Sequence, residues 1–262
     1  MMKGFDISID DAGYTTVDSR WSRHSFPYPH NRLYFITEGE ASIRVKNGGI
    51  IKLVPGTMHL LPAFRLYSAA CTGTMTHYWI HCSMHDPSGI DMLSLYDTPL
   101  SCTPADSEQV RRACKTIIAH HRSMKLDARL ASSGAIHTLL APFFTGAREK
   151  KGVRRFFPVL AHIDAHLAEE LDIPSLAALM PLEPNYFSNE FTKTFGISPK
   201  RFIIRRRIEA STLLLSHTSK PVSAIARETG FSGDVHFSRT FRMHMRSTPG
   251  AYRKIYRRET PI

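Results

Sequence analysis

Two groups of side chains in this sequence combine residue type and spacing in a way that could do chemistry. The members of the first group are polar or basic, and they recur at helical spacing in two stretches about fifty residues apart. Such side chains can bond base edges or phosphate oxygens. They are Asn185, Ser188, Asn189, Thr192 and Lys193 in one stretch, and Asp234, His236, Ser238, Arg239 and Arg242 in the other. Together they predict two surfaces that bind nucleic acid.

The second group lies in the N-terminal half, where His77, Trp79 and His81 alternate along a β-rich run. Alternating residues share one face of a strand, so two imidazoles would flank an indole. Polar groups around an aromatic platform suit a sugar. The same side chains could instead simply pack the interior of a β domain, and the residues leave both interpretations open.

An apolar frame repeats behind the polar residues of the first group. The frame of one copy is Leu176, Ala177, Phe187, Phe191, Phe195, Pro199 and Phe202, and that of the other is Ile225, Ala226, Phe237, Phe241, Met245, Pro249 and Tyr252. Aromatic residues spaced by four lie on one helical face. A duplicated frame implies two similar units, and each copy has helix-turn-helix spacing. The alternative is an ordinary helical core that binds no nucleic acid.

The elements expected around this frame follow from breakers and caps. A short helix over residues 175–180 ends at Pro181, which cannot continue the helical hydrogen bonds. Gly230 suits the tight turn of the second copy, and Ser232 and Asp234 are available caps. A long helix over residues 198–217 would hold the two recognition helices about 34 Å apart, as successive major-groove turns require. The run Arg205-Arg206-Arg207 on it is either a solvated face or a set of phosphate contacts.

The C-terminal stretch resembles the DNA-binding domain of the AraC/XylS family of bacterial transcription regulators. The residues that carry the resemblance are 173–177, Phe187, Phe191, 196–199, 207–208, 214–215, 225–226, 230–231, 237–239, Phe241, 248–249 and 252–253. The sequence departs from the family pattern at Pro181, Glu183 and Ser211, where Gly, a Ser/Thr cap and Ala are usual. We therefore expect the first recognition helix to form but to be less stable at its start.

Composition and charge agree with a globular, nucleic-acid-binding chain. The 262 residues carry a net charge of +11, of which residues 152–262 contribute 17 basic and 10 acidic side chains. A denser positive charge in this part suits a polyanion partner. The four cysteines, Cys71, Cys82, Cys102 and Cys114, fit neither a zinc site nor a redox pair and are expected to be reduced structural thiols. The N-terminus lacks the apolar core of a signal peptide, and we expect a cytoplasmic protein with no membrane partner.

The N-terminal part reads as a small β domain. Short β-rich runs alternate with turns from Leu33 to Ser83, including the hairpin signal Asn47-Gly48-Gly49, whereas residues 1–30 read as irregular. The region resembles the cupin barrel that precedes the DNA-binding domain in many family members. Its carriers are 33–40, 54–56, 60–62 and 77–81. The resemblance implies an effector site at Tyr34, Glu38, His59, His77, Trp79 and His81, although Glu38 replaces the sugar-binding Arg of the arabinose-responsive member.

A metal site is the alternative for this barrel, since His30, Glu38 and His59 fall near metal-binding cupin positions. The paired His-x-His that should precede the Glu is missing, so we expect neither a metal nor a cofactor. A cupin enzyme with a helical appendage is the rival from another class of protein. It would need a metal triad or a paired acid and base, and the sequence offers no convincing one. A barrel that only dimerises is the third interpretation.

The predicted fold is α+β in two domains. A cupin-like β-barrel spans 1–103, a helical dimerisation segment 104–146, a flexible linker 147–158, and an all-α domain with two helix-turn-helix motifs 159–258. Within the helical segment the pattern predicts helices from Pro104 and over 126–144, and Ile163 to Leu171 is expected to open the DNA-binding domain. The resemblance implies a homodimeric activator that binds double-stranded DNA, a small-molecule effector such as a sugar, and RNA polymerase.

Overall fold

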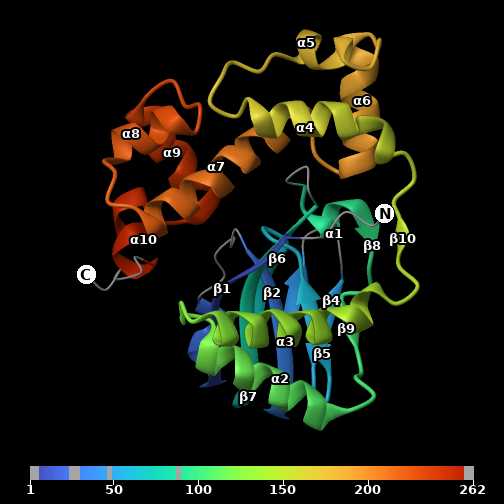
Figure 1. Cartoon of the computed structure of the whole chain (residues 1–262), viewed down its shortest axis with the longest axis vertical. Coiled ribbons are helices and arrows are strands. Elements are labelled where there is room, and N and C mark those ends of the chain that lie inside the picture. The colour runs from blue at the N-terminus through green and yellow to red at the C-terminus, as the bar shows by residue number, and fades with distance from the viewer. Residues whose placement is uncertain (1–5, 24–29, 46–48, 87–89, 257–262) are drawn as a thin grey trace. The chain divides into compact units, whose positions relative to one another are not determined.

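The computed structural model describes residues 6–23, 30–45, 49–86 and 90–256, and the chain forms two compact units (Figure 1). The first unit ends at Glu149, and the second comprises the chain from Lys150 onward together with a short stretch that ends at Ile90. Strands dominate the first unit, whereas all regular elements in the described part of the second unit are helices. The expectation of an α+β protein with two domains is therefore confirmed.

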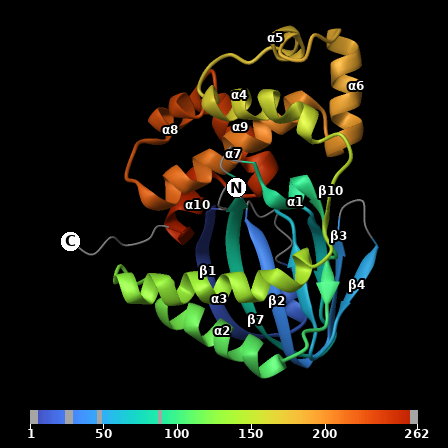
Figure 2. The same cartoon turned by 45° about the vertical axis from the view of Figure 1, so that its right-hand side comes forward.

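Two antiparallel sheets build the first unit. The larger sheet has the order β1-β7-β2-β5-β9, and the smaller one β4-β3-β6. The strands are β1 (Asp6–Val17), β2 (Asn31–Gly39), β3 (Ala41–Val45), β4 (Ile50–Leu53), β5 (Met58–Leu61), β6 (Leu66–Ala70), β7 (Met75–His85) and β9 (Ser101–Cys102). Tyr34 and Ile36 of the larger sheet share one buried cluster with Ile43 and Leu66 of the smaller sheet, so the two sheets pack face to face (Figure 2).

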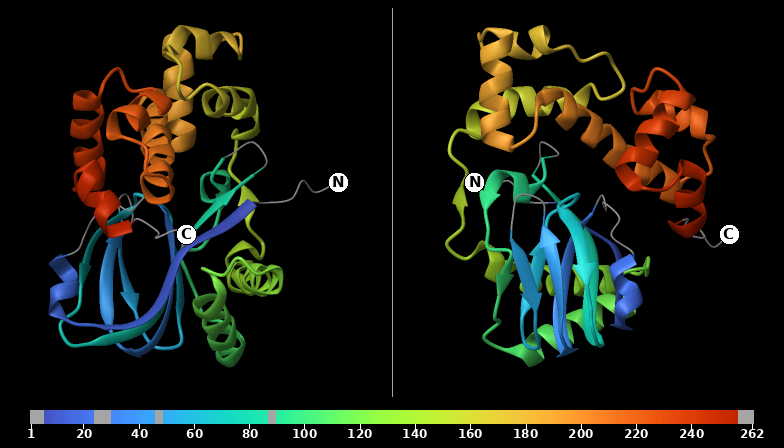
Figure 3. Two further views of the ribbon diagram at one scale, coloured as in Figure 1. Left: turned by 60° about the vertical axis from the view of Figure 1, so that its left-hand side comes forward. Right: turned by 180° about the vertical axis from the view of Figure 1, so that it is seen from behind.

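Two helices cover the other face of the larger sheet (Figure 3). They are α2 (Ser107–His120) and α3 (Leu126–Phe144), and their apolar residues Ile117, Ile136 and Phe143 are buried against Leu33 and Ile80. The carboxylate of Asp106 caps α2, since it accepts from the backbone N–H groups of Glu108 and Gln109 at 2.8 and 2.9 Å. Short elements complete the unit: η1 (Ser19–Arg23), α1 (Met92–Leu95), β8 (Tyr96–Asp97) and β10 (Arg148–Glu149).

The irregular segment predicted for residues 1–30 is wrong in its described part. Residues 6–17 form the longest strand of the unit, β1, which pairs with β7 along its whole length. Polar residues interrupt the apolar alternation of this segment, so its sequence pattern is a weak indication of a strand. The strand with which it pairs lies some seventy residues away in the chain. The hairpin signal at Asn47-Gly48 lies outside the described residues, although the flanking strands β3 and β4 do pair as expected.

The second unit is a chain of helices. They are η2 (Arg154–Phe156), α4 (Phe157–Ala165), α5 (Ile173–Ala178), α6 (Pro184–Phe195), α7 (Pro199–His217), α8 (Val222–Glu228), α9 (Asp234–Met245) and α10 (Pro249–Tyr256). The long helix α7 joins the group formed by α4 to α6 to the group formed by α8 to α10 (Figure 1). Its predicted span, 198–217, is confirmed.

Two predictions are wrong in their bounds: the end of the linker 147–158 is helical, and the first helix is not Ile163 to Leu171. Val153 and Phe156 are fully buried, and the helix begins at Phe157 and ends at Ala165. The ring of Phe156 packs at 5.3 Å from Phe191 and 5.4 Å from Phe195. The end of the expected linker therefore belongs to the aromatic core beneath α6.

Candidate nucleic-acid interface

The duplicated apolar frame folds into two matching turns. In the first copy the N–H of Leu182 donates to the carbonyl of Ala177 at 3.1 Å, and in the second the N–H of Phe231 donates to the carbonyl of Ala226 at 2.9 Å. The aromatic faces behind them are equally buried, since Phe187, Phe191, Phe237 and Phe241 are inaccessible to solvent. The two helix pairs predicted from the repeat are therefore present, and each fixes the direction of its second helix, α6 or α9.

On α6 the predicted polar residues lie opposite this buried face. Asn185, Asn189, Thr192 and Lys193 are exposed, and Ser188 is half-buried beside them. The hydroxyl of Thr192 donates to the Ser188 carbonyl at 2.7 Å, so its proton is used within the helix. The helix forms although Glu183 makes no side-chain capping bond, which agrees with the expected loss of a Ser/Thr cap.

On α9 the predicted residues Asp234, His236, Arg239 and Arg242 are exposed, and Ser238 is half-buried. The first turn uses its polar groups locally. Asp234 Oδ1 accepts from the Val235 N–H at 2.8 Å, and the Ser232 hydroxyl lies 3.2 Å from His236 Nδ1. Ser232 is therefore bonded to a ring and is not a helix cap, contrary to expectation, and Gly233 occupies the capping position.

The central line of the exposed α9 face contains two residues that the sequence reasoning missed. Positions 235, 239, 242 and 246 share one face by the helical repeat, and all four are exposed. Val235 keeps 79% of its surface accessible. Arg246 ends α9 with a left-handed φ of +54°, at the position where α6 has Gly196 with a φ of +72°. Reading both helices in the register of the repeat would have revealed these two residues.

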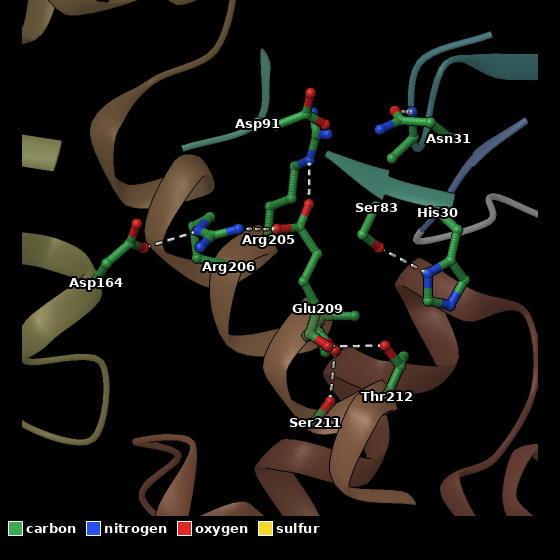
Figure 4. A network of polar contacts seen from close by, with 12 residues as sticks. His30, Asn31, Ser83, Asp91, Asp164, Arg205, Arg206, Glu209, Ser211 and Thr212 are labelled. Atoms are coloured by element: carbon green, nitrogen blue, oxygen red, sulfur yellow. Dashed lines mark hydrogen bonds and ion pairs between the residues drawn. The ribbon is translucent and has the colours of Figure 1, made fainter. Parts of the chain in front are cut away.

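The three arginines of the run on α7 all form hydrogen bonds or ion pairs within the second unit. Arg206 joins α7 to α4, with its Nε 2.8 Å from Asp164 Oδ1 and its Nη1 2.6 Å from Glu209 Oε2 (Figure 4). Arg205 Nε lies 2.9 Å from the other oxygen of Glu209. Arg207 donates to the backbone carbonyls of Leu167 and Glu169 at 3.0 and 2.6 Å. All three side chains therefore take part in bonds that brace the unit.

The electrostatics of this brace favour full ionisation. Burial alone would raise the pKa of Glu209, but the charges of Arg205 and Arg206 lower it overall. Burial opposes the charge of Arg206, and the carboxylates of Glu209 and Asp164 outweigh it and raise the Arg206 pKa. The network joins α7 to α4 and to the segment that follows α4.

In the first unit, the predicted effector residues gather on the face of the larger sheet that meets the smaller sheet. Tyr34 and His77 are buried there, with ring centroids 5.1 Å apart, and Trp21 lies 6.0 Å from His77. Trp79 and His81 follow on the same strand at 4.9 Å from each other. The indole lies over Gly13, where an added Cβ would come within 2.5 Å of the Trp79 ring.

His77 has an acceptor atom to offer on this face. Burial lowers its pKa to about 4, against a weaker opposing effect of the Thr15 carbonyl that bonds the ring, so the imidazole is neutral at pH 7. Among the described residues its Nδ1 has no hydrogen-bond partner, although the side chain is only 3% exposed. Because the bond to Thr15 uses the other nitrogen, Nδ1 carries a lone pair and can accept from a ligand.

Two predicted effector residues differ from this arrangement, Glu38 in its position and His59 in its hydrogen bonds. Glu38 is exposed beyond a register irregularity between β2 and β7, so it does not lie with His77 and Trp79. His59 is buried on the expected face, but both ring nitrogens already meet hydroxyls, Thr57 at 2.7 Å and Ser101 at 2.8 Å. Burial lowers the pKa of His59 to about 4, which fits a neutral residue that packs the sheet.

The remaining expectations on metals and thiols concern the same unit. Over the described ranges, His, Cys, Asp and Glu side chains form no cluster of three that could hold a metal ion. His30 is close to Asp10 at 2.8 Å and to Ser83 at 3.3 Å. The cysteines are unpaired, and burial raises the pKa of Cys102, Cys114 and Cys82, as structural thiols require. Within the described residues, none of the helices has the length and hydropathy needed to cross a bilayer.

Comparison with known proteins agrees with this geometry. Residues 176–255 match the family described as a helix-turn-helix domain. The regulatory protein PocR of Salmonella typhimurium is 38% identical over 95 residues, which are 36% of this chain and 31% of that protein. The Msm operon regulatory protein of Streptococcus mutans is 23% identical over 263 residues, 97% of this chain and 94% of that protein. This chain thus spans about a third of PocR but nearly all of the Msm regulator.

Among solved structures, ToxT from Vibrio cholerae superimposes on the whole chain. The TM-score is 0.61 at 11% identity, with 96% of this chain and 98% of ToxT covered. At that identity the similarity concerns the fold alone. It covers both the helical unit and the sheet unit. Residues 176–255 therefore form a helix-turn-helix domain similar to that of bacterial transcription regulators, and the chain as a whole shares the fold of ToxT.

Proposed function

We propose that α6 and α9 enter successive major-groove turns of one DNA site and read its sequence, while the sheet unit senses a small molecule. The observation that carries the proposal is the pair of exposed polar faces on a duplicated buried frame. Each face lies opposite a row of inaccessible aromatic residues, so the frame cannot turn it inward without exposing that core. Asn185, Ser188, Asn189, Asp234, His236, Ser238 and Arg239 are the proposed groove-facing residues, and Thr192, Lys193 and Arg242 lie nearer the phosphates.

The test is binding of the full chain to a pool of randomised duplexes at two salt concentrations. Enrichment of a sequence, with affinity that falls as salt rises, supports the proposal, because phosphate contacts release counterions. Equal binding to every duplex, or none at low salt, would reject it. A variant with both Asn189→Ala and Arg239→Ala should fold normally, because both side chains are exposed. It should lose the enrichment at the base pairs that these two side chains contact.

For the effector we favour a sugar or a similar polyhydroxylated compound. The neutral His77 offers an acceptor for a hydroxyl group, and Trp79 and Trp21 offer rings for an apolar sugar face. A carboxylate is the second candidate, because the cationic Arg32 is buried on this unit and donates to Tyr34 at 3.4 Å. One ToxT structure holds an unsaturated fatty acid, which is such a carboxylate.

Thermal denaturation of the full chain with sugars and with fatty acids separates these candidates. A ligand that binds only the folded protein raises the melting temperature. Trp79→Ala should remove the rise without weakening DNA binding by the helical unit. A rise that survives in this variant would exclude Trp79 from the site, and no rise with either class would leave the third interpretation, a sheet unit without an effector.

We further propose that the protein acts as a homodimer through α3, in the cytoplasm where its DNA target lies, and that it activates transcription by contacting RNA polymerase. The outer face of α3 exposes Leu126 at 71% and Leu130 at 64%, one helical turn apart. A second copy would remove this apolar surface from water. Sedimentation of the full chain should show a dimer that Leu130→Asp dissociates, and a monomeric wild type would reject this part. A promoter reporter distinguishes activation from repression.

A further inference from the structure

Val235 occupies the second position of α9 and has no packing role in its unit. It is 79% exposed, whereas the buried side of the helix is formed by Phe237, Phe241 and Met245. A β-branched residue also has a lower helix propensity than Arg, Lys, Gln or Glu. Single exposed apolar residues are common, so exposure alone argues nothing. The position does, because the N-terminal residues of a recognition helix are those that contact base edges.

The neighbouring polar groups leave Val235 as the projecting side chain of the first turn. The carboxylate of Asp234 accepts from the N–H of Val235 at 2.8 Å, within its own helix end. His236 is held by the Ser232 hydroxyl at 3.2 Å and against the ring of Phe231 at 5.6 Å. Val235 instead continues the line of Arg239 and Arg242, spaced by four and seven residues, which is the basic face proposed to meet DNA.

The first helix pair shows what this position can do. Fifty residues earlier, the same place on α6 is occupied by Asn185, whose amide can bond both N6 and N7 of adenine. An isopropyl group cannot form such bonds. In the major groove, the apolar group that a base pair presents is the C5-methyl of thymine. The two copies thus place an amide and an alkyl group at one equivalent position.

We propose that Val235 reads the C5-methyl group of a thymine in the half-site that α9 contacts. This inference rests on the proposed function, in which α9 enters the major groove. Burial of one methyl-sized group against another contributes about fourfold in affinity. The effect is small for one contact, but it selects thymine over cytosine at a position where no hydrogen bond from the side chain could.

The test uses the duplex that the full chain selects from a randomised pool. Each thymine is replaced in turn by deoxyuridine, which removes only the methyl group and leaves base pairing unchanged. One replacement in the α9 half should weaken the wild type about fourfold. Val235→Ala should bind the thymine duplex about fourfold more weakly and should not respond to that same replacement, so the two changes form a double-mutant cycle.

Met243→Ala is the matched control, because Met243 is also apolar, on α9 and 66% exposed, but lies at its C-terminal end. It should retain the full response to deoxyuridine, and melting temperatures of all variants should agree. Three outcomes would overturn the inference without affecting sequence-specific binding. The selected α9 half-site could contain no thymine, the wild type could bind every deoxyuridine duplex as tightly as the thymine duplex, or Val235→Ala could respond to deoxyuridine as the wild type does. Absence of any selected sequence would overturn the proposed function as well.

Discussion

The two helix pairs of the C-terminal unit share an interior and differ in what they expose. Leu176, Ala177, Phe187 and Phe191 in one pair match Ile225, Ala226, Phe237 and Phe241 in the other, all inaccessible or nearly so. On the outside, Asn185, Asn189 and Thr192 of α6 correspond to Val235, Arg239 and Arg242 of α9. The two pairs therefore share the residues that determine the fold and differ in the residues that determine what each helix can bind.

If α6 and α9 bind DNA as proposed, this difference assigns them different parts in that binding. The exposed line of α6, formed by Asn185, Asn189 and Thr192, is neutral, with Lys193 beside it. Its amide groups can form hydrogen bonds with base edges. The α9 line carries three guanidinium groups, from Arg239, Arg242 and Arg246, and none of them has a hydrogen bond or ion pair among the described contacts. Cations of this kind supply most of the salt-dependent affinity for DNA. We therefore expect α9 to provide the stronger electrostatic attachment and both helices to provide sequence discrimination.

The largest expected effect concerns the turn of the second pair. Gly230 has a φ of +77°, and a Cβ there would lie 2.1 Å from the Leu167 carbonyl oxygen and 2.8 Å from Arg207 Nε. Gly230→Ala should therefore lower the free energy of unfolding by more than about 3 kcal/mol, since strain and a backbone clash add. Denaturant unfolding of the full chain, followed by circular dichroism of its helices, measures the loss.

Gly196→Ala is the matched control for that turn. Its φ of +72° is similar, but a Cβ would meet no atom within 4 Å. It should lose only about 1 kcal/mol, from the backbone conformation alone. Equal losses in the two variants would show that the close approach of Leu167 and Arg207 to Gly230 does not matter.

Next in size is sequence discrimination at the equivalent pair Asn189 and Arg239. Arg239→Ala should lose about 1–3 kcal/mol of discrimination at one base pair, and Asn189→Ala a similar amount at another base pair about one helical turn away. Affinities for single-substituted duplexes measure both. If either variant weakened binding equally on all sequences, that side chain would be a phosphate contact and the comparison would need revision.

A smaller effect, with opposite signs in two assays, is expected at Arg246. This residue takes a left-handed φ of +54° where α6 has a glycine, a conformation that costs about 1 kcal/mol for a residue with a Cβ. Arg246→Gly should therefore raise the free energy of unfolding by about 1 kcal/mol and weaken DNA binding. Arg246→Ala should weaken DNA binding without the gain in stability. A gain in both assays for Arg246→Gly would mean that the guanidinium does not meet DNA.

The smallest effect is in the salt dependence of binding. Arg242→Ala should reduce the slope of log affinity against log salt by about 1, whereas Thr192→Ala at the equivalent place on α6 should leave it unchanged. Titrations of the selected duplex at four or five salt concentrations resolve this difference. Equal slopes in both variants and the wild type would contradict the assignment of the electrostatic attachment to α9.

Short sequence windows were sufficient to predict elements that depend on neighbouring residues in the chain. The spans of α3 and α7, and the matched turns around Ala177 and Ala226, follow from periodicity, caps and breakers in short windows. Contacts between distant residues were beyond this reasoning. The pairing of β1 with β7 and the bonds of Arg206 to Asp164 and of Arg207 to Leu167 join segments at least forty residues apart. A single irregularity in β2 was enough to place Glu38 outside the predicted site.

The exposed faces of α6 and α9 were foreseen because side-chain type and helical spacing identify them. Val235 and Arg246 were missed for reasons that are physical. An exposed valine has no polar chemistry to attract notice, and a left-handed arginine cannot be recognised until the end of α9 is known. When the two copies are aligned by their phenylalanines, Val235 corresponds to Asn185 and Arg246 to Gly196. Only this alignment shows that the two copies differ in residue type at these positions.

The most direct test of this account is the sequence that the full-length protein selects from randomised duplexes, read together with the Asn189→Ala and Arg239→Ala variants. We predict two informative blocks with centres about 10 base pairs apart, and each of the two substitutions should remove the discrimination at one base pair of one block only. A single block, or two blocks that both variants lose together, would contradict the claim that α6 and α9 read separate turns of the same groove.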